Sequence, residues 1–353
     1  MKSRVIGTVL FGLGVLALVF AGGLAFVVAP AVKQLPYDME LTQSVAEAPN
    51  ARFMQITNGQ VAVNSGLLRS TITVQPDAGS TAKLEGDLDG EALVWVAGQQ
   101  VQRADNGELI SAYSTSLAVD RKSGAARDWD GQWLDTGSDR QPVKYSGQTY
   151  KFPFGTEQDG QYTYYDRDTR RSDPMTFVKT EEIQGLETYQ FTQTLQNETQ
   201  QVAADQLAVV LGSLLPGATA GEIKYSNTRT VWVEPNTGQY IRVQEQQRKQ
   251  LVSTDGRTAD VLDATFAYTD DTVTKSAETA KDNLFLLNLV SLWGPIGLAV
   301  LGLVLAAIGA LLLVRGRLSQ RAAVGVPAQW TGSPRHAAKG DDTTQVTARA
   351  DNS

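Results

Sequence analysis

The densest group of side chains suited to binding lies between residues 145 and 171. Seven aromatic residues there are followed by three arginines: Tyr145, Tyr150, Phe152, Phe154, Tyr162, Tyr164, Tyr165, Arg167, Arg170 and Arg171. Aromatic faces with phenolic tips can line a groove for a lipid or a sugar, and guanidinium groups can hold a phosphate or a carboxylate. In the alternative interpretation the aromatic residues cover the domain core and the arginines pair with neighbouring aspartates, namely Asp166, Asp168 and Asp173.

The first interpretation makes nine residues candidate ligand-binding residues. Eight belong to this aromatic segment, and the ninth lies in a predicted strand further along the chain. They are Tyr150, Phe152, Phe154, Tyr162, Tyr164, Tyr165, Arg170, Arg171 and Trp232.

The rest of the sequence offers little for catalysis. It has no cysteine, which excludes thiol nucleophiles, thiolate metal sites and iron–sulfur clusters, and its one histidine is His336. No Walker loop is present, and no G-x-G-x-x-G follows a strand. Paired carboxylates remain possible, but no pair is distinguishable from ordinary surface acids. We therefore predict no catalytic residue, no metal and no cofactor, and expect that the protein is not an enzyme.

Two long uncharged runs predict the transmembrane helices that hold the candidate site at a membrane. Residues 5–32 and 284–314 contain 28 and 31 residues without a charge, whereas about 20 apolar residues suffice to cross a hydrocarbon core. A cleaved signal peptide is the alternative for the first run, but its apolar region is usually only about 7–15 residues long. We expect a retained helix, in which five glycines could allow close helix contact: Gly7, Gly12, Gly14, Gly22 and Gly23.

The charges beside these runs predict the topology. Basic residues in residues 1–4 and at the start of residues 315–353 favour the cytoplasm for both termini. The intervening residues 33–283 then lie outside, and their 23 basic and 35 acidic residues argue against nucleic-acid binding. The tail, residues 315–353, is too polar to fold alone, so we expect it to be disordered.

Alternating apolar and polar residues predict a mainly β (α+β) fold for the outer domain. In residues 189–195 and 262–268, the large apolar side chains recur at every second position and fall on one strand face. One internal segment, residues 202–215, has the spacing of an amphipathic helix that packs against a sheet.

A weak internal repeat predicts how these strands are grouped. Residues 116–124 resemble residues 230–238, since each stretch consists of a strand, an acidic residue, a turn and a glycine. Their separation is close to half the length of the outer domain. We therefore expect two similar antiparallel units, residues 40–140 and 141–283.

Several blocks of the sequence carry a resemblance to a known family. They are Val28-Ala29-Pro30; Tyr150-Lys151-Phe152-Pro153-Phe154; Tyr164 through Asp166 with Thr169-Arg170-Arg171; Tyr225-Ser226-Asn227-Thr228-Arg229-Thr230 with Trp232-Val233-Glu234-Pro235 and Thr237-Gly238; and Leu262-Asp263-Ala264-Thr265-Phe266. In these blocks, which span most of residues 1–314, the chain resembles an actinobacterial membrane-protein family. That family is called domain of unknown function 3068 and is also labelled PorA-type porin.

The resemblance implies a plasma-membrane protein of the cell envelope in bacteria that contain mycolic acids. Family members are linked to lipoglycan maturation, the step from lipomannan to lipoarabinomannan. A non-enzymatic lipid or lipoglycan binding and transport factor is thus expected, with membrane lipids, a lipid-linked glycan of the lipomannan type and envelope glycosyltransferases as partners. The hairpins also resemble the half-barrel lipid carriers of lipoprotein sorting, a likeness of fold alone.

Two other functions remain open from the sequence. One is a channel-forming oligomer of the porin type, although a membrane barrel needs many strands with an apolar outward face. The other is a structural scaffold for the enzymes that assemble the envelope.

Overall fold

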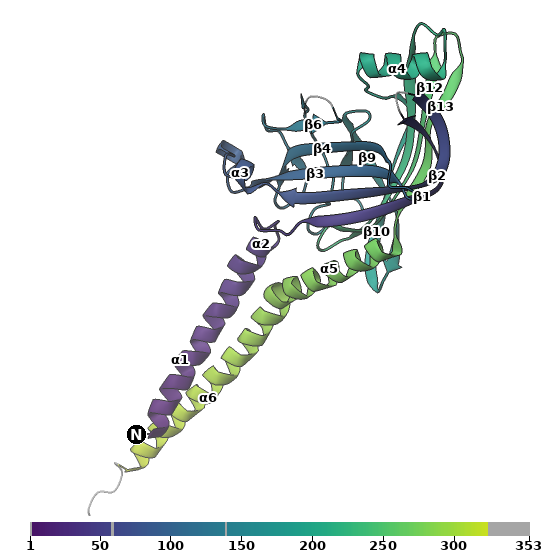
Figure 1. Cartoon of the computed structure of the whole chain (residues 1–353). Coiled ribbons are helices and arrows are strands. Elements are labelled where there is room, and N and C mark those ends of the chain that lie inside the picture. The colour runs from purple at the N-terminus through teal and green to yellow at the C-terminus, as the bar shows by residue number, and fades with distance from the viewer. Residues whose placement is uncertain (1, 58–59, 138–139, 324–353) are drawn as a thin grey trace, which may run out of the picture. The chain divides into compact units, whose positions relative to one another are not determined.

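The computed structural model describes residues 2–57, 60–137 and 140–323 (Figure 1). The chain divides into two compact units, one formed by residues up to Leu18 with those from Val300 onward, and one formed by Val19–Ala299. The larger, called the β unit below, contains every strand.

The long helices lie at the two ends of the described chain, and the strands lie between them with the short helices α3 and α4 inserted. The α-helices are α1 (Lys2–Gly23), α2 (Ala29–Val32), α3 (Ala78–Thr81), α4 (Ala204–Leu214), α5 (Asp270–Asn288) and α6 (Gly294–Ala323). Two short π-helices are η1 (Leu24–Val28) and η3 (Leu289–Trp293), and one short 3-10 helix is η2 (Gly86–Leu88). The strands are β1 (Thr42–Thr57), β2 (Gln60–Pro76), β3 (Ala92–Arg103), β4 (Leu109–Asp120), β5 (Ala126–Arg127), β6 (Trp133–Asp135), β7 (Gln141–Pro142), β8 (Tyr162–Asp166), β9 (Arg171–Ile183), β10 (Leu186–Thr199), β11 (Gly221–Glu234), β12 (Gln239–Ser253) and β13 (Thr258–Tyr268).

The strands form one antiparallel sheet of 13 strands, which confirms the predicted mainly β fold. Its order is β7-β6-β4-β3-β2-β1-β13-β12-β11-β10-β9-β8, with β5 beside β4. The first and last long strands pair directly, with Ala46 opposite Tyr268 and Phe53 opposite Leu262. Strands from the two expected units, residues 40–140 and 141–283, therefore continue into one another across the β1–β13 junction (Figure 1).

The predicted strand faces are confirmed. Phe191 and Leu195 on β10 are buried, as are Ala264 and Phe266 on β13, whereas Thr265 between these last two is exposed. Alternation therefore points one row of side chains into the unit and the next row outward.

The predicted internal helix is confirmed as α4. It buries Val210 and Leu211 against Ile223 of β11 and Leu251 of β12. Leu207 and Leu214 lie on the same face of the helix and pack against this cluster. The apolar face of α4 therefore covers the sheet where the long strands end.

A second long helix, α5, begins in a stretch that the sequence analysis placed inside the β-rich domain. The Thr269 hydroxyl caps it by accepting the N–H of Thr272 at 3.2 Å. Val273, Ala277 and Ala280 are buried against the sheet. These contacts are few and the side chains are small, so the segment lacks the strong apolar stripe that predicts a helix from sequence.

Two helices are long and apolar enough to cross a membrane, as predicted. They comprise Arg4–Val32 and Asp270–Arg315. Helix α6 continues to Ala323, so its last turns occupy the start of the tail for which disorder was predicted. The remainder of that tail, including His336, lies outside the described residues.

Glycines bring α1 and α6 together within the smaller unit. A Cβ added to Gly14 would lie 2.6 Å from the Gly302 carbonyl oxygen, and one added to Gly7 would lie 3.0 Å from that of Gly309. Apart from the backbone of α1 itself, no atom of the described residues lies within 4 Å of a Cβ added to Gly12, Gly22 or Gly23. Two of the five predicted glycines therefore mediate the contact between backbones.

Replacing Gly14 by leucine is expected to force α1 and α6 apart. Overpacking of this kind costs about 1–3 kcal/mol, and the helix axes should separate by roughly 2 Å toward ordinary interhelical spacing. Spin labels at Val9 and Leu311, both exposed, would report the separation by pulsed electron resonance. The matched control is Gly12→Leu, which should leave the distance unchanged; equal distances in both variants would contradict the prediction.

Candidate ligand cavity

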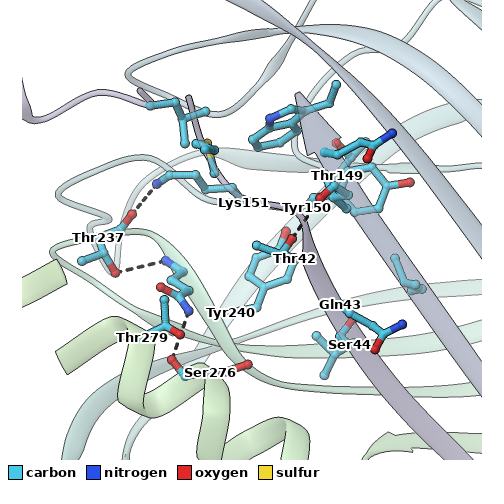
Figure 2. A pocket seen from close by; sticks show the side chains of 18 of the residues that line it. Thr42, Gln43, Ser44, Thr149, Tyr150, Lys151, Thr237, Tyr240, Ser276 and Thr279 are labelled. Atoms are coloured by element: carbon cyan, nitrogen blue, oxygen red, sulfur yellow. Dashed lines mark hydrogen bonds between the residues drawn. The ribbon is translucent and has the colours of Figure 1, made fainter. Parts of the chain in front are cut away.

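The β unit contains a cavity of about 1010 Å³. Its wall is built from the inward faces of β1–β4, β8 and β11–β13, from one face of α5, and from two connecting segments, residues 31–41 and 145–154. Figure 2 shows side chains from these elements gathered around the cavity, among them Thr42, Tyr150 and Tyr240. Its volume is at the upper end for small-molecule sites.

One part of the lining is apolar and comes from the ends of the two uncharged runs. Ala31 and Val32 close the first run, while Leu286, Leu287 and Val290 lie near the start of the second. A hydrocarbon chain that packs against these side chains removes only apolar surface from water.

Another part of the lining carries polar atoms without a partner. The indole Nε1 of Trp95 and the hydroxyls of Thr149, Tyr165 and Tyr240 form no hydrogen bond within the described chain. These four side chains are at most 9% exposed. An unpaired buried polar group costs about 1–3 kcal/mol, and these four atoms are themselves shielded from water.

Arg229 is the centre of a buried ion cluster beside this polar wall. Its Nε donates to Glu245 at 2.7 Å, its Nη2 lies 3.2 Å from Asp166, and its guanidinium stacks over the Tyr164 ring at 4.2 Å. Asp166 also accepts from the Tyr225 hydroxyl at 3.1 Å. Burial alone would raise the pKa of Glu245, but the charge of Arg229 outweighs it and lowers that pKa.

Asp168 extends the cluster on its other side. Lys249 Nζ lies 2.8 Å from it and Arg167 Nη2 lies 3.5 Å away. Burial would raise the pKa of Asp168, but these two cations lower it to about 2. Three cations thus face three carboxylates, so the cluster carries no net charge at neutral pH.

The acidic residues of the predicted repeat have a structural role. The carboxylate of Asp120 accepts the backbone N–H of Ser123 at 2.8 Å, and that of Glu234 accepts the N–H of Thr237 at 2.8 Å. Asp166 makes the same contact with Thr169 at 3.1 Å, a third example that the sequence analysis missed. Each acid therefore closes the tight turn after its own strand.

The segment Tyr150–Phe154 lies between two of these turns. Phe152 N–H donates to the Gly238 carbonyl at 2.9 Å, and Phe154 N–H donates to the Lys122 carbonyl at 3.2 Å. Gly238 has φ of +69°, and a Cβ there would overlap the Phe152 carbonyl oxygen. The two repeated turns thus fix the backbone that presents Tyr150 and Phe154 to the cavity.

Four of the nine candidate residues line the cavity: Tyr150, Phe154, Tyr164 and Tyr165. Phe152 instead fills the core, with its ring 4.9 Å from that of Tyr162 and 5.0 Å from that of Phe191. Tyr162 packs in the same cluster. The aromatic segment therefore does both things considered from sequence, since part of it covers the core and part lines a cavity.

The other three candidates lie outside the cavity lining. Trp232 packs against α5 and donates to Glu181 at 3.0 Å. Arg170 donates to Gln141 at 2.7 Å, and Arg171 pairs with Asp173 and Glu198, both at 2.8 Å. Pairing with neighbours, the alternative for the arginines, is thus observed for Arg171 with Asp173 and for Arg167 with Asp168.

Several cavity residues were not predicted because they are far apart in sequence. Trp95, Arg229, Tyr240 and Glu245 come from three different strands. A signal was present in β11, where Arg229 falls on the same alternating face as the buried Tyr225 and Val231. A charge in phase with a buried face indicates a buried ion pair or a site.

This geometry defines a class of protein: a β domain with an internal, partly apolar cavity, in a chain whose two end helices can cross a membrane. The chain belongs to the family described as Porin PorA, whose sequence profile matches residues 6–311. The resemblance found in the sequence blocks is therefore confirmed.

Two solved structures were found to be similar. One is a MaoC domain protein dehydratase from Chloroflexus aurantiacus J-10-fl, at 12% identity over 76% of this chain and 90% of that chain, with a TM-score of 0.14. The other is the acyl-CoA thioesterase II TesB2 from Mycobacterium marinum, at 9% identity over 65% and 81%, with a TM-score of 0.11. Such scores carry no argument about fold or activity. No curated protein matches the sequence.

Proposed function

We propose that this protein is a non-enzymatic binding and transport factor that holds a lipid or lipoglycan in its cavity. Its place is the actinobacterial plasma membrane, where it supports lipomannan and lipoarabinomannan maturation. The observation that carries this proposal is the divided lining of the cavity, apolar near the two uncharged runs and built from polar and aromatic side chains elsewhere. An amphipathic molecule satisfies both parts at once.

The proposed topology puts both termini in the cytoplasm and the β unit outside the plasma membrane, following the basic residues beside each span. Leu286, Leu287 and Val290 belong both to the cavity lining and to the second uncharged run. These shared apolar side chains support the passage of an acyl chain between the outer leaflet and the cavity.

The polar wall supports a sugar-bearing head group. Aromatic side chains such as Trp95 and Tyr150 line the cavity together with polar side chains such as Gln99, and a carbohydrate ring offers an apolar face and hydroxyl groups to such a surface. The neutral ion cluster around Arg229 holds these walls in place. The proposed carrier function requires no catalytic residue.

Bound lipid should be detectable in the purified protein. Native mass spectrometry of the full chain, extracted in a mild detergent, is expected to show an adduct with the mass of a lipid or glycolipid, which chromatography would then identify. A ligand-free species alone would overturn the carrier and favour the scaffold. Conductance in planar bilayers that survives deletion of residues 40–280 would instead support a pore built from the helices.

A further inference from the structure

Lys151 is a buried cation on the cavity wall that the proposed function leaves without a role. It is 8% exposed and belongs to the segment between the two repeated turns. Figure 2 shows its side chain extended along the wall toward Thr237. A buried ammonium group requires compensation from hydrogen bonds or opposite charge.

The contacts of Lys151 are all neutral. Its Nζ donates to the carbonyl of Phe152 at 2.8 Å and to that of Thr237, and it lies 3.7 Å from the centre of the Phe154 ring. An ammonium group has three N–H donors, so one is left over. Within the described residues no carboxylate forms an ion pair with it, in contrast to the cations of the Arg229 cluster.

A second cation in the cavity lining is also without a carboxylate partner in the described chain. Arg121 donates to the carbonyls of Leu35 at 2.8 Å and Gly90 at 3.0 Å, and it stacks over Tyr37. It adjoins Lys122, whose carbonyl accepts the N–H of Phe154. The turn after β4 and the segment that carries Lys151 therefore bring to the same cavity two cations that form no ion pair within the described residues.

We propose that Lys151, supported by Arg121, forms a subsite for an anionic group of the bound lipid, a phosphodiester or a carboxylate. This inference rests on the proposed function, since it names the chemistry of the head group that the cavity takes. The free N–H of Lys151 donates to an anionic oxygen, and the apolar lining holds the attached chains. A charge-assisted hydrogen bond in such surroundings is about twice as strong as a neutral one.

The ionisation of Lys151 gives the subsite a pH signature. Burial lowers its pKa to about 7, while the opposite charge of Glu234 acts to raise it. The other charged groups of the surrounding elements are Arg121, Lys122 in its pair with Glu91, Asp120 in its pair with Arg127, Glu40 in the cavity lining, and Lys275 in its pair with Asp271. The interval from pH 6 to pH 8.5 brackets the pKa of Lys151. Loss of the Lys151 proton in that interval should therefore weaken anion binding.

The test is a competition on the full chain in detergent, read by native mass spectrometry. An equimolar mixture of dioctanoyl phosphatidylglycerol, whose charge is constant over this pH interval, and uncharged dioctanoylglycerol is added at pH 6. We expect the anionic lipid to be preferred by about tenfold in the native chain. Lys151→Met should remove the preference, and Lys151→Arg should keep it.

The pH arm distinguishes a binding role from a structural one. The preference should fall between pH 6 and pH 8.5 in the native chain and stay constant in Lys151→Arg, because arginine remains protonated. Displacement of the anionic lipid by inorganic phosphate would assign the same subsite to a free anion as well. Equal binding of both lipids by the native chain would overturn the anion subsite but not the carrier, whereas binding of neither would overturn both.

Discussion

Replacing Arg229 by methionine is expected to lower the free energy of unfolding of the β unit by about 3–5 kcal/mol. Methionine retains an unbranched side chain but removes the cation that faces Asp166 and Glu245. Asp166 is 1% exposed, so its charge has little access to water once the guanidinium is gone. The loss is measured by urea unfolding of the full chain in micelles, followed by tryptophan fluorescence.

The deficit caused by Arg229→Met should depend on pH. In the native chain the pKa of Glu245 is lowered, so its contribution to stability is present above its ordinary pKa and is lost as pH falls. In the variant burial, which raises the pKa of Glu245, is opposed only by the Gln247 hydrogen bond and the charge of Arg167. The folded pKa is therefore higher than in the native chain, and the ionised carboxylate contributes less stability above its ordinary pKa. The difference between the two proteins should therefore be largest near pH 7 and shrink toward pH 4.5.

The matched control is Arg52→Met on β1. Arg52 makes a comparable ion pair, 3.0 Å from Asp260, but its side chain is 57% exposed. Such surface pairs contribute about 0–1 kcal/mol. A similar loss in both variants, or a deficit for Arg229→Met that does not vary with pH, would show that the buried cluster is not held by its charges.

The sequence contains enough information for the two apolar helices, the sheet and part of the cavity wall. Charge-free runs and period-two alternation are local signals, and the aromatic segment includes Tyr150 and Tyr164, which line the cavity. The spacing of aromatic residues does not show which of them face inward. Phe152 and Tyr150 are separated by one residue, yet Phe152 fills the core because its backbone is bonded to Gly238 in a turn far along the chain.

The remaining residues required the topology. Trp95 and Tyr240 meet around one space only because β1 pairs with β13 and brings the two ends of the sheet sequence together. The two paired strands are separated by most of the domain in sequence, and no local sequence pattern predicts a pairing over that distance. The wall formed by α5 was hidden for a different reason, since its buried face consists of valine and alanine in a segment otherwise rich in polar residues.

Filling the cavity from α5 should abolish lipid retention. Ser276 and Thr279 lie three residues apart, one helical turn, and both line the cavity (Figure 2). The double variant Ser276→Trp/Thr279→Trp adds two indole rings to the space that the ligand would occupy. We expect at least about a tenfold loss of lipid that copurifies with the full chain, corresponding to about 1.4 kcal/mol or more of binding free energy.

The control for this variant uses the same substitutions at the same spacing on another face of α5. Glu278 and Lys281 are exposed and do not line the cavity, and replacing one acid and one base leaves the net charge unchanged. Tryptophan differs little from these residues in helix propensity, by less than about 0.7 kcal/mol, so Glu278→Trp/Lys281→Trp should fold and retain lipid. Loss of lipid in both variants would mean that α5 is disturbed, and retention in both would place the lipid outside the cavity. Loss only in Ser276→Trp/Thr279→Trp requires that the lipid occupy the space between α5 and the polar wall, because that is where the two double variants differ.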